Sequence, residues 1–322
     1  MNSVSVAKAG IPAAKQTSKI PIREVLPFAG FALIVVLFAF LTDGRIIAAA
    51  NLKLLLSQTY MLLIASMGVL FIMSMGCLDF SQGSMLGVSC IVVCYLSNYN
   101  IFIAVIGGMA TGAAIGAING FFHVKRKMPS FIVTICNMYL FRGVCAYATT
   151  SSPVYATADI AELNTLPFMI SMTIIALVIG FIVFRFTSVG ANVKAIGAGE
   201  KAARFAGIKV QKTKFLVYVA AGAITGFAAF INAIKVGSVT STGGNQLETQ
   251  ILIALVLGGM PISGGAKVRF SNIIIGVLTY KILSSGLVMM GFTTQMQQLI
   301  QGIIFLIVVA VFSDRKSILV IK

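Results

Sequence analysis

Long apolar runs, separated by short polar intervals, dominate this chain. The main runs cover residues 27–41, 55–75, 84–97, 101–122, 129–147, 166–184, 215–234, 246–259, 271–290 and 297–312. Helices that cross a bilayer need about 20 apolar residues. The runs at 84–97 and 246–259 are shorter, which favours re-entrant or broken helices. The pattern predicts an all-α polytopic membrane protein with about ten transmembrane helices in one domain, 27–312.

The first run, 27–41, has a second interpretation. A basic head precedes it, and the alanines at 48–50 resemble the cleavage site of a signal peptide. However, the head is long, and residues 42–45 are too polar for a usual cleavage region. We therefore favour a first span that follows a cytoplasmic segment, 1–26.

Composition strengthens the membrane assignment. Of 322 residues, 58% are hydrophobic and 10% are charged, and the mean hydropathy is +1.00. The net charge of +16 does not indicate nucleic-acid binding, because the cations lie between apolar runs rather than among aromatic residues. The five cysteines also lie in or beside apolar runs, so we expect neither a disulfide framework nor a metal site.

The distribution of cations predicts the topology, because cytoplasmic loops carry an excess of Lys and Arg. With the N-terminus inside, 19 of the 24 cations fall on cytoplasmic segments. Those segments are 1–25, 123–128, 185–214, 263–270 and 313–322. Removing one span would move a basic loop outside. The charges therefore favour an even number of spans, with both termini and the tail 313–322 in the cytoplasm.

The longest polar interval, 187–214, contains six cations and a single acid, Glu200. Residues 200–206 are good helix formers, with Gly199 before them and Gly207 where a left-handed cap would end the helix. So short a helix needs a surface to lie against. We interpret this interval as a docking element for a soluble partner.

Ionisable side chains within membrane spans often mark functional sites. Asp79 lies between the second and third runs, followed by the polar residues Ser81, Gln82 and Ser84. Two interpretations are open: a path or gate function for this stretch, or a structural cap for a helix that begins at Ser84.

Further polar side chains lie inside later runs. Asn119, Asn137, Arg142 and Glu248 are the ones we select as candidates for a translocation path or gate. The neutral side chains among them, Asn119 and Asn137, suit an uncharged, hydroxylated solute, but interhelical hydrogen bonds use the same residue types.

Glycines four residues apart mark one face of the fourth run. They are Gly108, Gly112, Gly116 and Gly120. Because glycine lets two helix backbones approach closely, we favour helix packing over contact with substrate for this face.

The chain lacks the residues of a soluble enzyme. It has no phosphate-binding loop of the G-x-x-x-x-G-K-[ST] type, and its single histidine, His123, lies at the end of a run. We expect no catalytic residues, no cofactor and no ATP site.

Four stretches, in order along the chain, resemble motifs of the bacterial ABC-importer permeases for monosaccharides such as ribose, arabinose, xylose and galactosides. They are LDFSQGS at 78–84, PSFIVTICNMYLFRG at 129–143, AIGAGEKAARFAGIKV at 195–210 and ETQILIALVLGGMPISGG at 248–265. The chain departs from the family pattern at three positions: it has Phe80 where Leu is usual, Gln82 where Val is usual, and Gly199 where Asn is common. In addition, residues 266–269 follow the pair Gly264 and Gly265, where the family frequently has another glycine.

The resemblance implies a multi-pass subunit of the bacterial cytoplasmic membrane, surrounded by lipid, that transports but does not hydrolyse ATP. It implies three protein partners: a cytoplasmic ATPase, an extracytoplasmic sugar-binding protein, and a second permease copy or paralogue. At matching positions, the ATPase-coupling residues are Gly197, Glu200, Ala202, Ala203 and Gly207.

Other functions remain open from the sequence. Within the same class, the solute of an importer could be a nucleoside or a sugar-like signalling molecule. A different class is an ion-coupled secondary carrier that works alone, although a relay of acids and histidines is missing. A membrane-embedded enzyme is the least favoured, because nucleophiles, bases and metal ligands are sparse.

Overall fold

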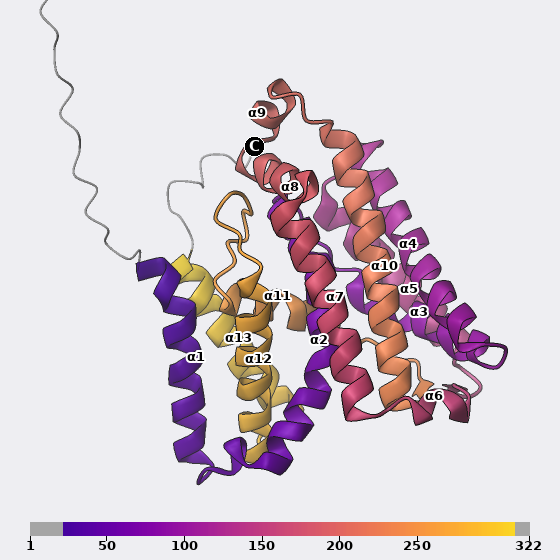
Figure 1. Cartoon of the computed structure of the whole chain (residues 1–322), viewed down its shortest axis with the longest axis vertical. Helices are drawn as coiled ribbons and strands as arrows, with labels where there is room; N and C mark the ends of the chain where they lie inside the picture. Colours follow the sequence, from indigo (N-terminus) through magenta and orange to yellow (C-terminus); the bar gives the residue numbers. More distant parts are fainter. Residues whose placement is uncertain (1–21, 313–322) are drawn as a thin grey trace, which may run out of the picture.

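A computed structural model describes residues 22–312 of the chain. The tail 313–322 and most of the predicted segment 1–26 lie outside this range. Within these residues, ten apolar helices form the body of the structure (Figure 1). They are α1 (Ile22–Leu41), α2 (Ala49–Ser74), α3 (Gln82–Ser97), α4 (Ile101–Val124), α5 (Ser130–Ala148), α7 (Leu166–Phe186), α10 (Val210–Val236), α11 (Leu247–Leu257), α12 (Ser271–Met289) and α13 (Thr294–Phe312).

Six of these helices, α2, α4, α5, α7, α10 and α12, are long and apolar enough to cross a membrane. The other four have shorter apolar stretches, and α3 and α11 correspond to the two short runs of the sequence. The structure therefore confirms a predominantly helical architecture with helices suited to cross a membrane. The number of crossings, ten, and the cytoplasmic location of both termini stay predictions.

Short elements connect the long helices. They are η1 (Arg45–Ile47), α6 (Ala158–Glu162), α8 (Ser188–Ala198), α9 (Glu200–Phe205), β1 (Val154–Tyr155) and β2 (Ser238–Val239). The two strands pair antiparallel and join the loop after α5 to the loop after α10. Neither this pair nor α8 was part of the sequence prediction.

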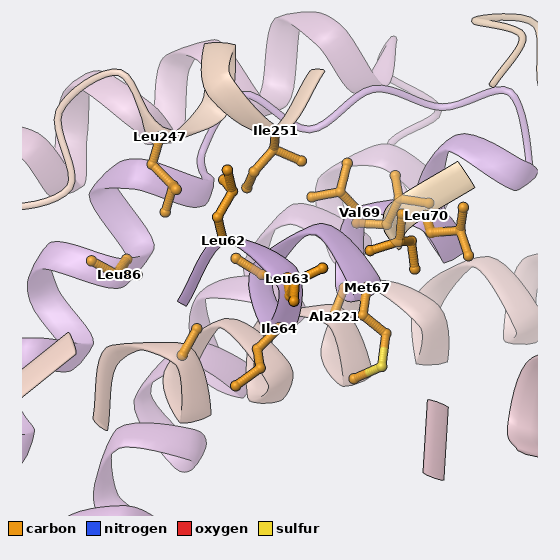
Figure 2. Close-up of a cluster of buried hydrophobic side chains, with 14 of the residues drawn as sticks. Leu62, Leu63, Ile64, Met67, Val69, Leu70, Leu86, Ala221, Leu247 and Ile251 are labelled. Atoms are coloured by element: carbon orange, nitrogen blue, oxygen red, sulfur yellow. The ribbon is translucent and has the colours of Figure 1, made fainter. Parts of the chain in front are cut away.

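Helix α2 is the centre of the fold. From Leu62 to Ser74 every residue is buried, as expected for a helix that is apolar on all sides and packed all round. Figure 2 shows Leu62 on the side of α11, near Leu247 and Ile251, and Met67 on the side of α10. Helices α7, α8 and α12 also pack against α2, so this one helix connects most of the molecule.

The glycine face of α4 lies directly on α10. A methyl group at Gly112 would overlap the carbonyl oxygen of Gly222, and one at Gly116 would overlap that of Tyr218. The contact is reciprocal, because Gly226 on α10 meets the backbone of Gly108 in the same way. Gly120, the fourth of the series, faces Phe215. The two backbones thus touch over most of the length of α4, which no residue with a Cβ atom would permit.

Three described segments that the charge pattern assigns to the cytoplasm, 123–128, 185–214 and 263–270, gather at one end, near α8 and α9 in Figure 1. Glu200 of α9 forms an ion pair with Lys214 at the start of α10. Gly265, in the loop between α11 and α12, donates its backbone N–H to the carbonyl of Ser74 at the end of α2 (3.0 Å). The opposite end carries η1 and α6.

The α4–α10 contact makes a stability prediction. Gly112→Ala should lower the free energy of unfolding in detergent by about 1–3 kcal/mol, because the new methyl group overpacks a rigid backbone contact. Gly143→Ala on α5 is the matched control, since nothing lies within 4 Å of the added methyl group. Equal stability of the two variants would contradict the close contact.

Candidate functional site

The chain leaves helical geometry between α2 and α3. Helix α2 ends at Ser74, Gly76 takes a left-handed conformation (φ +72°), and α3 begins at Gln82. Irregular backbone at membrane depth must find partners inside the protein. The polar residues at 79–84 are therefore placed where such partners are needed.

The Asp79 carboxylate is fully buried and takes part in several hydrogen bonds. One oxygen accepts from the Ser81 backbone N–H at 2.8 Å and from the Ser81 hydroxyl at 2.6 Å. The other accepts from the Gln82 side-chain amide at 2.8 Å, while the Ser84 hydroxyl donates to the Ser81 carbonyl at 2.9 Å. The helix begins at Gln82, two residues before the expected start at Ser84. Asp79 thus fixes the residue that precedes α3.

Three other helices join this cluster. The Asn119 amide of α4 donates to the Ser81 hydroxyl at 2.7 Å, and the Asn137 amide of α5 donates to the Asn119 carbonyl oxygen at 2.6 Å. On the other side, the Thr225 hydroxyl of α10 lies 2.5 Å from the Gln82 carbonyl oxygen. We call the seven residues Asp79, Ser81, Gln82, Ser84, Asn119, Asn137 and Thr225 the buried polar network.

Thr225 was not selected from the sequence. The available signal was the neighbouring residue, Gly226. It follows Gly222 by four residues, and small residues at that spacing mark a close helix contact. Its partner, Gln82, lies more than a hundred residues away along the chain, so the pairing itself had no local sign.

An ion pair lies against the first turn of α3. Arg142 of α5 and Glu248 of α11 approach to 3.0 Å, and the Glu248 side chain is buried. A methyl group at Gly83 would overlap the second Glu248 carboxylate oxygen and the carbonyl of Gly244. That carboxylate oxygen has no hydrogen-bond partner within residues 22–312. The N-terminal turn of α3 favours a negative charge at this position.

The structure brings all eight predicted path residues to the start of α3. Four belong to this segment, two reach it through the network, and Arg142 and Glu248 reach it beside Gly83. Most are buried, whereas Arg142 keeps 30% of its side chain exposed. The network therefore holds helices together, and Arg142 has the most accessible polar group of the ion pair.

The predicted docking element forms a helix–turn–helix piece, α8 and α9. As predicted, α9 begins after Gly199 and ends before Gly207, whose φ is +84°. Ala203 is buried against the body and Ala202 is exposed. Phe205, exposed over 92% of its surface, points away from the protein.

Glu200 fastens α9 to α10. Its carboxylate contacts the Lys214 ammonium at 2.8 Å and the Arg204 guanidinium at 3.3 Å. The hydrogen bond from Lys214 holds the pKa of the Glu200 carboxyl below its usual range. The stabilisation by this pair is therefore present above the ordinary glutamate pKa, and is lost as the pH falls through the lowered value.

The α8 helix touches the end of α2. A methyl group at Gly197 would overlap the Ser74 carbonyl oxygen, which accepts the hydrogen bond from Gly265. Only four residues, 75–78, lie between Ser74 and Asp79, the first residue of the buried polar network. The docking element and the network are thus joined by one short stretch of chain.

Within residues 22–312, no three His, Cys, Asp or Glu side chains come together in a way that could hold a metal ion. The polar groups described above can donate and accept hydrogen bonds and carry one ion pair.

These features define a multi-pass helical membrane protein with broken helices and a basic helical element at one end. A family model described as "Branched-chain amino acid transport system / permease component" matches residues 51–309. The chain belongs to this family of ABC-importer permeases, in which the subunit spans the inner membrane and is generally not an enzyme.

Curated relatives include sugar permeases. The ribose import permease protein RbsC of Escherichia coli K12 is 30% identical over 83% of this chain and 86% of its own length. The RbsC protein of Bacillus subtilis is 31% identical over 92% and 94%. The L-arabinose permease AraH of Azospirillum brasilense is 30% identical over 82% and 80%. No solved structure matches the chain.

The buried polar network gives a stability prediction. Asn119→Ala should lower the free energy of unfolding in detergent by about 1–3 kcal/mol, because its removal leaves the buried Asn137 amide without its acceptor and the Ser81 hydroxyl without its donor. Asn164→Ala, at an exposed position, is the control.

A double-mutant cycle separates the network from simple loss of packing. Asn119→Ala and Asn137→Ala should be non-additive, because each removes the same hydrogen bond. Additive losses would show that the two side chains act independently.

Proposed function

We propose that the chain is the transmembrane subunit of an ATP-driven importer that moves a monosaccharide across the cytoplasmic membrane by alternating access. The observation that carries this proposal is the agreement between relatives and architecture. Relatives of this chain over most of its length are named as ribose, xylose, L-arabinose and D-allose permeases. In addition, the chain has an exposed basic helix, α9, to which a cytoplasmic ATPase could bind.

A cytoplasmic ATPase is the first proposed partner. Helix α9 presents Phe205 as an exposed apolar anchor, with the exposed cations Lys201 and Arg204 on the same short helix. An apolar side chain surrounded by charges is a common centre of a protein interface. We expect it to enter an apolar groove with an acidic rim on the ATPase. Gly197, Ala203 and Gly207 shape the element, and Ala202 lies on its exposed side.

A second permease copy or paralogue is the next partner, with the path between the two. Helix α5 is among the least buried of the six long helices and also the least apolar of them. A helix of that kind is poorly suited to face lipid on all its open sides. We therefore assign the exposed side of α5, with Arg142, to the path at the dimer interface, where an extracytoplasmic binding protein delivers sugar.

Alternating access follows from the connection described above. ATP binding in the ATPase would move α8 and α9, and the contact of Gly197 with Ser74 would pass that movement to α2. The start of α3 then shifts together with the buried polar network. This movement displaces the Arg142–Glu248 ion pair, and the path then opens to the other side of the membrane. Gln82, which departs from the family pattern, accepts the hydrogen bond from the Thr225 hydroxyl in this arrangement.

Uptake into liposomes tests the function. The chain, co-reconstituted with its ATPase and binding protein, should accumulate radiolabelled ribose, xylose, arabinose or allose only when ATP is present.

Glu200→Lys should reduce ATPase co-purification while leaving membrane insertion intact, because it reverses the charge beside Lys214 and Arg204. Lys53→Glu, at the opposite end, is the control for charge reversal.

Two results would contradict the proposal. Normal ATPase co-purification with Glu200→Lys and with Gly207→Val would remove α9 from its role. Uptake by the chain alone, collapsing with an ion gradient, would favour a secondary carrier. That alternative has one supporting observation: the first turn of α3 meets the start of α11 at Glu248, and broken helices form ion sites in such carriers. ATP-dependent uptake of a nucleoside instead of a sugar would change the proposed solute but leave the ATP-driven import mechanism in place.

A further inference from the structure

A long apolar groove lies on the surface between α7 and α10. It encloses about 930 Å³, within the range of about 300–1,000 Å³ found for ligand sites. The two helices run beside each other along its length in Figure 1. Its floor is formed by α2 and the outer part of α4, through Ile64, Met67, Phe71, Val105 and Met109.

The groove follows one face of α10 from the cytoplasmic end. On this side the lining residues start at Lys209, directly before α10, and continue along α10 to Phe227. Eighteen residues of helix at about 1.5 Å each span about 27 Å, nearly the apolar thickness of a bilayer, about 30 Å. The wall on α7 is made by small and branched residues, Ala176, Ile179, Gly180 and Val183.

Only the cytoplasmic mouth of the groove carries charge. Lys209 and Lys212 line it there and are both exposed, with Asn192 and Thr213 nearby as hydrogen-bonding groups. None of the described lining residues is acidic. The nearest acid in the sequence, Glu200, already pairs with Lys214 and Arg204. The groove thus has a cationic mouth and an apolar interior.

We propose that this groove binds an anionic phospholipid of the cytoplasmic leaflet. The phosphate lies between Lys209 and Lys212, and one acyl chain extends along α10 toward Phe227. Basic pockets between transmembrane helices on the cytoplasmic side recognise anionic lipid headgroups by this combination of charge and apolar surface. A monosaccharide does not fit this interior, because its hydroxyl groups would lie against side chains that offer no hydrogen bonds.

The bound lipid also contacts the docking element. The mouth of the groove is formed by Val189 and Asn192 of α8 and by residues 206–208, which connect α9 to α10. An occupied groove therefore braces the junction from which α9 projects. The proposal concerns a binding site of the chain itself, and it holds whichever solute the chain transports.

Lipid binding can be measured on the purified chain by native mass spectrometry. Phosphatidylglycerol and phosphatidylcholine with identical acyl chains are added separately to the protein in detergent. We expect phosphatidylglycerol to bind roughly thirtyfold more tightly, because each lysine near an anionic headgroup contributes to affinity. Lys209→Gln with Lys212→Gln should abolish the difference. Lys125→Gln with Lys127→Gln, on another cytoplasmic loop, should preserve it.

A second pair of variants tests the acyl chain. Ala220 is exposed and lines the groove, so Ala220→Phe should fill it and lower the binding of both lipids. Ala110→Phe, an exposed position of α4 outside the groove, should bind lipid like the unsubstituted chain. Glycerol phosphate, which has no acyl chain, should not compete.

Several outcomes would overturn the proposal. One is equal affinity for the two lipids in the unsubstituted chain. Another is unchanged binding by Ala220→Phe. Competition by glycerol phosphate would indicate a simple anion site. Loss of the lipid preference when the chain is purified with its partner subunits would indicate that a protein helix occupies the groove.

Discussion

The structure depends on one constraint: a chain that leaves helical geometry inside a membrane must satisfy its polar groups internally. Between α2 and α3 this is achieved by the Asp79 carboxylate, with hydrogen bonds that extend to α4, α5 and α10. The same break lets α3 start within the protein and place its first turn beside Glu248 of α11. Thus this interruption of the helix also brings the candidate path residues together.

The position of the break connects it with the surface. Helix α2 is buried on all sides from Leu62 to its end at Ser74, where it meets Gly197 of α8 and Gly265. On the far side of α10, the glycine contact with α4 keeps those two helices at a fixed distance. A rigid centre that contacts the docking element at Gly197 is suited to transmit movement, because packed interiors shift as units rather than deform.

Local patterns in the sequence predicted much of this fold. Apolar length located the long helices, the two short runs identified α3 and α11, and Gly199 and Gly207 bounded α9. Long-range contacts gave no such signal. The β1–β2 pair, the contact of Gly197 with α2, and Thr225 as partner of Gln82 each join segments far apart in sequence. The grouping of Arg142 and Glu248 with Asp79 likewise required the folded chain, although the ionisable residues themselves were recognisable.

The most direct test measures sugar transported per ATP hydrolysed when the contact between α8 and α2 is changed. Gly197→Ala, in the reconstituted complex, places a methyl group against the Ser74 carbonyl. Gly199→Ala is the matched control, because its added methyl group would be 3.8 Å from the nearest atom and its backbone is extended. The account predicts that Gly197→Ala still binds the ATPase but lowers the ratio severalfold, while Gly199→Ala leaves it unchanged. Equal ratios in both variants would contradict it.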